Sequence, residues 1–318
     1  MNRFTTQLLA AMLSAIGFVG VAAAQTAPKV VLGMSGWTGF APLSLADKAG
    51  IFKKNGVDVE LRMIPPVPRS AALAAGALNA AATTVDQHIV WMSAGIPTVQ
   101  VLLIDKSNGG DGIVVRGNIK SIKDLRGKTV AVDGAGTVQH FMLSYILEKN
   151  GMTIQDVTRH TMGAQPAAQS FVAGENDAAV TYEPYLSTVR AKPDSGTILA
   201  TTKDYPVVID TLVFRKDFIA ANPKTVKAVV DSFYEAQDMI RKEPQKSFEI
   251  MGAVVKQSGE QFAKSSAFIT WTDRTATAQY YAKEHAPFVD TAVRVLKFNR
   301  VIKTDVKAAD MIDLRFLK

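Results

Sequence analysis

The chain contains an internal repeat, and this feature restricts the possible folds more than any single motif does. The first copy spans residues 29–84 and the second spans residues 128–182. Each copy reads as a strand, a glycine-containing loop, a helix, an Asn-Gly turn, a second strand, and a helix that ends at Ala-Gly. Strands that alternate with helices of this length form parallel sheets through right-handed crossovers, so each copy predicts one α/β lobe.

The two copies also end alike. The matching segments are Gly76-Ala-Leu-Asn79-Ala-Ala-Ala-Thr83-Thr84 and Gly174-Glu-Asn-Asp177-Ala-Ala-Val-Thr181-Tyr182. Glycine turns and alanine-rich helices are common, so a chance match is the alternative interpretation. The agreement over the whole order of signals favours a true repeat.

The segments outside the copies predict how the lobes are joined. β-rich runs lie at 97–104, 112–116 and 207–215, and Asn108-Gly109-Gly110 predicts a bend between the first two. Two crossings of this kind predict a two-strand hinge, which lets lobes close on a ligand. We expect helices at 223–241, 245–255 and 287–298 to cover lobe 1 and part of the hinge. The predicted lobes, each a mixed sheet flanked by helices, are 25–112 plus 212–318 for lobe 1 and 113–211 for lobe 2.

The first residues have the pattern of a secretion signal. Arg3 precedes an apolar run at 8–21, which ends in Ala22-Ala23-Ala24. The run is shorter than the roughly 20 residues that a permanent membrane helix needs. We therefore predict a signal peptide at residues 1–24, removed during export to the periplasm.

Composition excludes several classes of protein. The chain has no cysteine, which excludes disulfides, cysteine-bound metals, thiol nucleophiles and a lipoprotein anchor. The formal net charge of +7 is spread along the chain without basic runs, so no nucleic-acid partner is expected. The four histidines lack metal-ligand spacing, and no phosphate-binding loop motif is present. We expect neither a metal nor a cofactor.

Four loops are candidates for ligand contact, because ligands of open α/β sheets bind beyond the carboxyl ends of the strands. They are the glycine loops at 35–40 and 134–139 and the strand ends at 83–86 and 181–184. A stiff proline-rich segment at 65–68 precedes a further candidate. The candidate ligand-binding residues are Trp37, Gly39, Phe40, Arg69, Thr83, Thr84, Asp86, Gly136, Thr137, Tyr182 and Glu183.

Each candidate also has a structural interpretation. Thr83 fits ligand contact and helix capping equally well. For Asp86 and Glu183 we favour capping, because an acid at a helix start is stabilising by itself. Arg69 either points its guanidinium into the cleft or is a solvated surface charge. Trp37 stands between glycines in a loop, which favours a wall of the ligand site over a core position.

Four segments resemble the nitrate/sulfonate/taurine-type periplasmic solute-binding proteins of ABC transporters. They lie at 35–43, 50–59, 127–132 and 177–185, and the similarity extends over nearly the whole chain after residue 24. The resemblance implies the class II periplasmic-binding-protein fold. It also implies that Trp37, Thr83 with Thr84, Gly136 with Thr137, and Tyr182 with Glu183 line the cleft. The sequence departs from the family pattern at Asn79, often acidic there, and at Tyr182, where tryptophan is usual.

The predicted function is the periplasmic solute-binding component of an ABC importer, without enzymatic activity. It captures a small polar organic solute, such as a sulfonate, a taurine-like or a nitrogenous compound. The expected partners are that solute and the transporter permease in the inner membrane, and the protein is expected to be a monomer. One alternative is an enzyme related to pyrimidine-precursor synthases, which draw on histidine and cysteine; His140 is the residue to examine. The other is the binding subunit of a membrane sensor. The sequence leaves the charge of the solute open.

Overall fold

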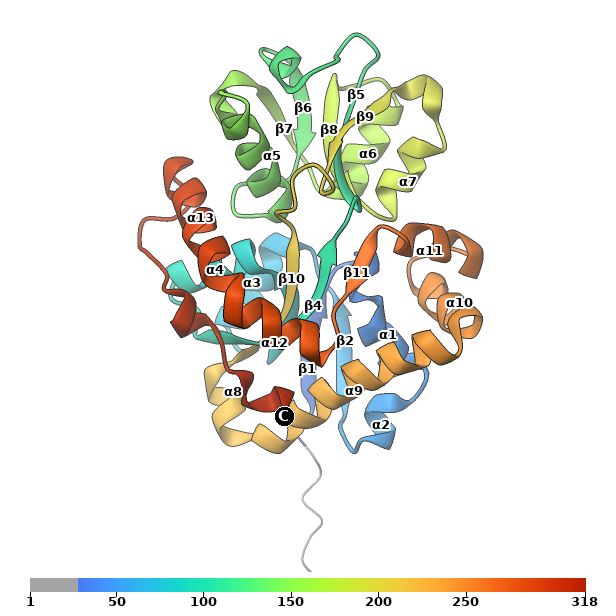
Figure 1. The fold of residues 1–318 in the computed structure, drawn as a ribbon, viewed down its shortest axis with the longest axis vertical. Helices are drawn as coiled ribbons and strands as arrows, with labels where there is room; N and C mark the ends of the chain where they lie inside the picture. Colours follow the sequence, from blue (N-terminus) through green and yellow to red (C-terminus); the bar gives the residue numbers. More distant parts are fainter. Residues whose placement is uncertain (1–27) are drawn as a thin grey trace, which may run out of the picture.

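The computed structural model describes residues 28–318, and its strands form one six-stranded and one five-stranded sheet. Each sheet and its helices make one lobe, and the lobes are stacked end to end (Figure 1). The predicted signal peptide at 1–24 lies outside the described residues. Within residues 28–318, no helix has both the length and the apolar character needed to span a membrane.

The six-stranded sheet belongs to lobe 1 and has the order β11-β4-β10-β3-β1-β2. Strand β1 runs parallel to both β2 and β3, whereas β10 runs antiparallel to β3 and β4. The strands are β1 (Val30–Met34), β2 (Val59–Met63), β3 (Ala80–Thr84), β4 (Thr98–Ser107), β10 (Ile209–Arg215) and β11 (Ile269–Trp271).

The five-stranded sheet belongs to lobe 2 and has the order β7-β6-β8-β5-β9. Here β6 runs parallel to β7 and β8, and β5 runs antiparallel to β8 and β9. The strands are β5 (Asp111–Val115), β6 (Thr129–Val132), β7 (Thr158–Thr161), β8 (Ala178–Tyr182) and β9 (Thr197–Thr201).

The two sheets repeat one arrangement. The first copy of the repeat supplies β2-β1-β3 and the second supplies β7-β6-β8, and each trio is followed by one antiparallel strand. That strand is β5 in lobe 2, just after the chain leaves lobe 1, and β10 in lobe 1, just after the chain returns. The predicted fold class, two mixed sheets of an α/β protein, is confirmed. The strands change sheet a few residues before the predicted boundaries, since Asp111 already pairs in lobe 2 and Ile209 in lobe 1.

The helices flank the sheets on both faces (Figure 1). Those of lobe 2 are α5 (Val138–Lys149), α6 (Ala164–Val172) and α7 (Tyr185–Arg190). The others are α1 (Ala41–Lys48), α2 (Ile51–Lys54), α3 (Pro66–Ala74), α4 (Val85–Ser93), α8 (Lys216–Ala221), α9 (Pro223–Lys242), α10 (Pro244–Val254), α11 (Gly259–Ser266), α12 (Arg274–Lys283) and α13 (His285–Phe298).

Helix α9 shows why these segments are helical. Pro223 occupies its first turn, where a missing N–H costs no hydrogen bond. Its buried residues include Val226, Val229, Val230 and Phe233, a spacing that places them on one face. That face packs on α1 and α2 of lobe 1. Helix α13 starts two residues before the predicted Pro287, because proline is tolerated anywhere in the first turn.

Helix α13 contacts both lobes. It packs on α4 of lobe 1 and on α5 of lobe 2. Phe288 of α13 meets Phe141 of α5 edge to face, with ring centroids 6.3 Å apart. Val289, Ala292 and Val295 are fully buried in the same apolar cluster. The C-terminal part of the chain therefore covers one side of the hinge, as well as lobe 1.

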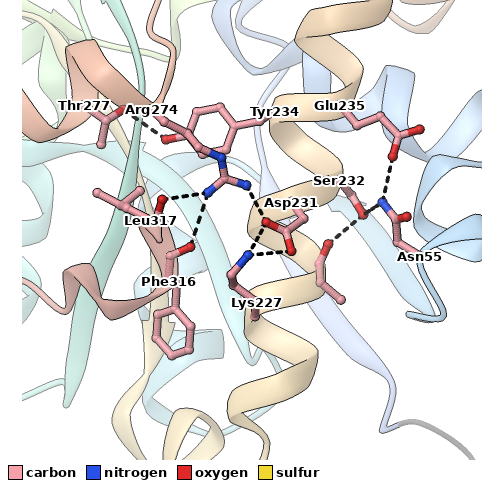
Figure 2. Close-up of polar contacts among 11 residues, drawn as sticks. Asn55, Lys227, Asp231, Ser232, Tyr234, Glu235, Arg274, Thr277, Phe316 and Leu317 are labelled. Carbon is pink, nitrogen blue, oxygen red and sulfur yellow. Dashed lines mark hydrogen bonds and ion pairs between the residues drawn. The ribbon is translucent and has the colours of Figure 1, made fainter.

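The chain end is fastened to lobe 1 by Arg274 at the start of α12 (Figure 2). Its guanidinium donates to the carbonyls of Phe316 (3.4 Å) and Leu317 (3.1 Å) and pairs with Asp231 of α9. It also lies over the ring of Tyr234, 4.4 Å from the centroid. Arg274 therefore joins α9, α12 and the last residues in one polar cluster.

Candidate functional site

A small cavity lies where the two lobes meet. Its volume of about 30 Å³ gives room for one or two water molecules. Six of the predicted residues line it: Trp37, Phe40, Arg69, Thr83, Thr84 and Tyr182. Polar residues that were not named as candidates also line it: Ser35, Gln87, Asp111, Gln139 and Asp210. Both lobes therefore contribute side chains to one cavity.

A wider cleft of about 500 Å³ adjoins this cavity and shares Ser35, Pro66 and Tyr182 with it. The first residues of α3 in lobe 1 and of α6 in lobe 2 form its opposite sides. This cleft is open to solvent at the lobe boundary, so the inner cavity lies next to solvent on this side.

The two lobes contact each other around the cavity. The ring of Trp37, from the loop after β1, meets Tyr182 at the end of β8 edge to face, with centroids 5.7 Å apart. The backbone N–H of Thr38 donates to the carbonyl of Glu183 at 3.4 Å. The Nε2 of Gln87 donates to the carbonyl of Gly136, also at 3.4 Å. These contacts join the lobes in a closed arrangement.

Gly39 allows Trp37 to take its place. A Cβ at residue 39 would lie 2.2 Å from Trp37 Nε1 and 2.2 Å from Asp105 Oδ2, closer than any real contact. The carbonyl of Gly39 accepts a hydrogen bond of 2.9 Å from Trp271 Nε1. Gly39 is not among the residues that line the cavity, so it supports the indole and leaves space for it.

Arg69 is buried, with only 1% of its surface exposed, so its interpretation as a solvated surface charge is wrong. Its Nη1 donates to the carbonyl of Ala82 at 2.7 Å, and its Nη2 donates to the carbonyl of Ile64 at 2.8 Å. Burial lowers the pKa of Arg69 to about 10, which leaves the guanidinium charged at neutral pH. The side chain fastens α3 to the sheet and presents its remaining surface to the cavity.

The end of β3 and the start of α4 hold a second polar group. Thr84 is the N-cap of α4 and accepts a hydrogen bond from the backbone N–H of Gln87 at 3.4 Å. The hydroxyl of Thr83 donates to Gln87 Oε1 at 2.8 Å. Thr84, and not Asp86, therefore caps the helix, and Thr83 orients the amide of Gln87 toward lobe 2.

Four buried carboxyl groups gather at the hinge side of the cavity. They are Asp86, Asp105, Asp111 and Asp210, and each is at most 2% exposed. Within residues 28–318, both oxygens of Asp86, Asp105 and Asp210, and Oδ2 of Asp111, have no hydrogen-bond partner of normal geometry. Asp105 and Asp210 stand directly opposite each other in the ladder between β4 and β10. Like charges in that position repel, so the two carboxyls do not both ionise readily.

Burial sets the protonation of this group. It raises the pKa of Asp86 and Asp111 to about 7 and that of Asp105 to about 8. The pKa of Asp210 is raised well above its ordinary value by burial and by the neighbouring Asp105 and Asp111. These carboxyls therefore retain protons near neutral pH, where exposed aspartates have none.

Four other predicted residues lie away from the cavity wall. Asp86 is behind it, in the first turn of α4. Gly136 has a φ of +89°, which glycine adopts without strain, and the Thr137 hydroxyl donates to Gly134 O at 2.8 Å. Glu183 accepts from the N–H of Ser187 at 3.1 Å and pairs with Arg190 at 3.3 Å. These residues shape the loops that carry the site.

Among the residues that line the cavity, Asp111, Asp210 and Gln139 were not predicted from the sequence. The two aspartates lie on the strands that cross between the lobes, and Gln139 lies at the end of a candidate loop. Asp111 and Asp210 lie at the starts of β5 and β10, which were considered only as a hinge. A charged residue after an apolar run, as in Val207-Val208-Ile209-Asp210, was the available signal, because a buried charge needs a partner. Gln139 ends a candidate loop but was not named as a ligand.

The four histidines lie away from the cavity wall. None of His88, His140, His160 and His285 lines the cavity. His88 lies between Thr98 and Gln100, and burial lowers the pKa of His140 to about 4. Across residues 28–318, no three His, Cys, Asp or Glu side chains are grouped so that they could hold a metal ion.

Comparisons with known proteins agree on the fold. The sequence pattern of the family described as NMT1/THI5 like matches residues 37–247. A chain of Brucella abortus, named only as a candidate binding protein, is 26% identical over 251 residues, or 77% of each chain. The alkanesulfonate-binding protein SsuA of Xanthomonas axonopodis pv. citri, bound to MOPS, matches with a TM-score of 0.77 and 17% identity over 91% of this chain and 99% of its own. The nitrate-binding protein NrtA of Synechocystis matches with a TM-score of 0.68 and 18% identity, over 91% and 92% of the two chains.

Proposed function

This chain belongs to the NMT1/THI5-like family, and we propose that it is the solute-binding component of an ABC importer. It is exported through the signal peptide at residues 1–24, and works in the periplasm as a monomer. It captures a small polar organic solute between its lobes and delivers the solute to the permease in the inner membrane. The solved relatives named for sulfonate and nitrate binding, which have the same fold, support this role.

One observation carries the proposal: within residues 28–318, the cavity between the lobes is lined from both sides by buried polar side chains that have no hydrogen-bond partner of normal geometry. The carboxyl of Asp210 comes from lobe 1, and both amide atoms of Gln139 and Oδ2 of Asp111 come from lobe 2. A buried polar group without a partner costs about 1–3 kcal/mol, so a solute that satisfies these groups is favoured. Because the groups belong to different lobes, the solute gains them all only in the closed state.

Capture then follows from differential contact. Rotation about the crossings at residues 108–110 and 202–208 would separate Trp37 from Tyr182 and open the cavity to the wider cleft. A solute bound to lobe 1 would gain the lobe 2 contacts on closure, and this gain would shift the equilibrium toward the closed state. The permease would recognise that state.

Enzymatic catalysis has less support. The chain has no cysteine, and none of its four histidines lines the cavity. The groups that do line it, aromatic rings, amides and carboxyls, are suited to holding a polar molecule and offer no activated nucleophile.

The test is a thermal-unfolding screen against sulfonates, amines, amidines, pyrimidines and nitrate, followed by calorimetry with each compound that raises Tm. Trp37→Ala and Tyr182→Ala are expected to weaken binding at least tenfold. Phe298→Ala, an exposed aromatic residue at the end of α13, is the control and leaves affinity unchanged within twofold. Unchanged affinity in both cleft variants would reject this binding site.

A further inference from the structure

The proposed function does not explain why acidic side chains outnumber basic ones around the cavity. Asp111 and Asp210 line it, and Asp86 and Asp105 lie behind them, against the single guanidinium of Arg69. Glu183 does not add to the excess, because Arg190 pairs with it. The site is therefore acidic on its hinge side.

An amide side chain also lines the cavity without a partner. Gln139 is 1% exposed, and within residues 28–318 neither atom of its amide has a hydrogen-bond partner of normal geometry. The indole N–H of Trp37 lies beside Asp105 Oδ2 and faces that carboxyl, so the ring contributes an aromatic wall to the cavity. Buried polar groups are almost always paired, so the amide of Gln139 indicates a position for a polar ligand.

A metal ion does not fit as that ligand. Within residues 28–318 the acidic side chains nowhere come together as a set of three or more potential metal ligands. The carboxyls border a cavity with aromatic walls, Trp37 and Tyr182 among them. An aromatic wall beside carboxylates suits an organic cation, which is attracted to both.

An anion fits less well. The guanidinium of Arg69 is the cationic group of the cavity wall, and two of its nitrogens already donate to the carbonyls of Ala82 and Ile64. An anion placed beside it would also face the carboxyls of Asp111 and Asp210. Each of these carboxyls repels a buried anion strongly once it loses its proton, so an anion requires both to stay protonated.

We infer that the solute is a small organic cation whose protonated nitrogen, an ammonium or an amidinium, donates hydrogen bonds to Asp111 and Asp210. Its body lies against Trp37 and Tyr182, and Gln139 accepts or donates one further hydrogen bond. This inference rests on the proposed function and assigns the substrate class of the same site. The solute enters through the wider cleft as the lobes separate, and the lobes then close around it less tightly than in this structure, whose cavity has room for only one or two waters.

Proton release should accompany binding. Burial raises the pKa of Asp111 to about 7, and a bound cation favours the ionised carboxylate. Affinity for a cation therefore rises with pH between about 5.5 and 7.5, by up to about tenfold per pH unit for each carboxyl that loses its proton. The charged and titratable groups that face this position are Arg69, Asp86, Asp105, Tyr182, Glu183 and Asp210.

The experiment compares probes of matched size by calorimetry at pH 7.5. The cations are ethanolamine, acetamidine and benzylamine; taurine is the zwitterion; ethanesulfonate and nitrate are the anions. At least one cation is expected to bind, and Asp111→Asn and Asp210→Asn are each expected to weaken it tenfold or more. Asp238→Asn removes the same charge from the exposed face of α9 and is expected to change affinity less than twofold.

The outcomes separate the two proposals. Binding of ethanesulfonate or nitrate without any cation overturns the charge assignment and leaves the binding function standing. The same holds if the cation affinity is unaffected by both cleft variants. Mass spectrometry of solute extracted from the natively purified protein gives a second readout: a cationic amine supports the inference and an anion overturns it. Protein that carries no solute and binds no probe contradicts the proposed function itself.

Discussion

Replacing Asp111 by asparagine tests whether burial raises the pKa of this carboxyl in the folded protein. Asp111 is the first residue of β5, pairs with Tyr182 in the ladder with β8, and is 2% exposed. Asparagine keeps the shape of the side chain and cannot ionise. The variant therefore removes one titrating group from the hinge and leaves the strand pairing in place.

The magnitude follows from the pKa of Asp111, which burial raises from the ordinary 3.8 to about 7. A carboxyl with a raised pKa in the folded state contributes stability below the unfolded pKa and loses it as pH rises through the folded pKa. Between pH 5 and pH 8.5 the native protein should lose about 3 kcal/mol of unfolding free energy through this group. Asp86, Asp105, Asp210 and Glu183 face it and remain in the variant.

The assay is urea unfolding of the solute-free protein at both pH values. Asp111→Asn is expected to lose about 2–3 kcal/mol less than the native protein over this interval. Asp238→Asn, at an exposed position of α9, should follow the native protein. Equal losses in the native protein and Asp111→Asn would refute the reasoning, because Asp111 would then titrate like an exposed aspartate.

Three further changes test the supports of the site. Gly39→Ala should lower the free energy of unfolding by about 1–3 kcal/mol in urea, because its Cβ would collide with Trp37 Nε1 and Asp105 Oδ2; an unchanged midpoint contradicts the close packing. Arg69→Lys should cost about 1–3 kcal/mol, because lysine cannot reproduce the bonds of the guanidinium to two carbonyls; a cost below 0.5 kcal/mol speaks against this anchoring. Arg274→Ala should speed amide exchange in the last residues and cost roughly 1–2 kcal/mol, and unaltered exchange there would show that other contacts hold the chain end.

The fold was predictable because the repeat fixes the order of elements in each lobe. Residues 76–84 and 174–182 match in sequence, and they end in the equivalent strands β3 and β8. Apolar β-runs lie between the copies and after the second copy, and they predicted the two crossings. The exact residues at which strands change sheet were less evident, because one apolar run continues across each change.

Site residues were predictable only where the local sequence marks them as unusual. Trp37 stands between glycines, and Tyr182 ends a repeat, so both attract notice in the sequence. Asp111 and Asp210 are 99 positions apart and meet only because β5 and β10 enter the two sheets at equivalent places. Gly39 packs against Trp37 and Asp105, and Glu183 accepts a hydrogen bond from the first turn of α7, the capping role that the sequence favoured. Sequence patterns locate loops well, and they do not distinguish a residue that faces the cavity from one that supports it.

The most direct measurement is a crystal structure of the protein with the compound that binds best in the thermal-unfolding screen. We expect density for that compound between the lobes, in contact with Trp37 and Tyr182 and with its charged nitrogen at Asp111 and Asp210. Density for the compound on an outer surface of either lobe, with the cavity between the lobes unchanged, would contradict it.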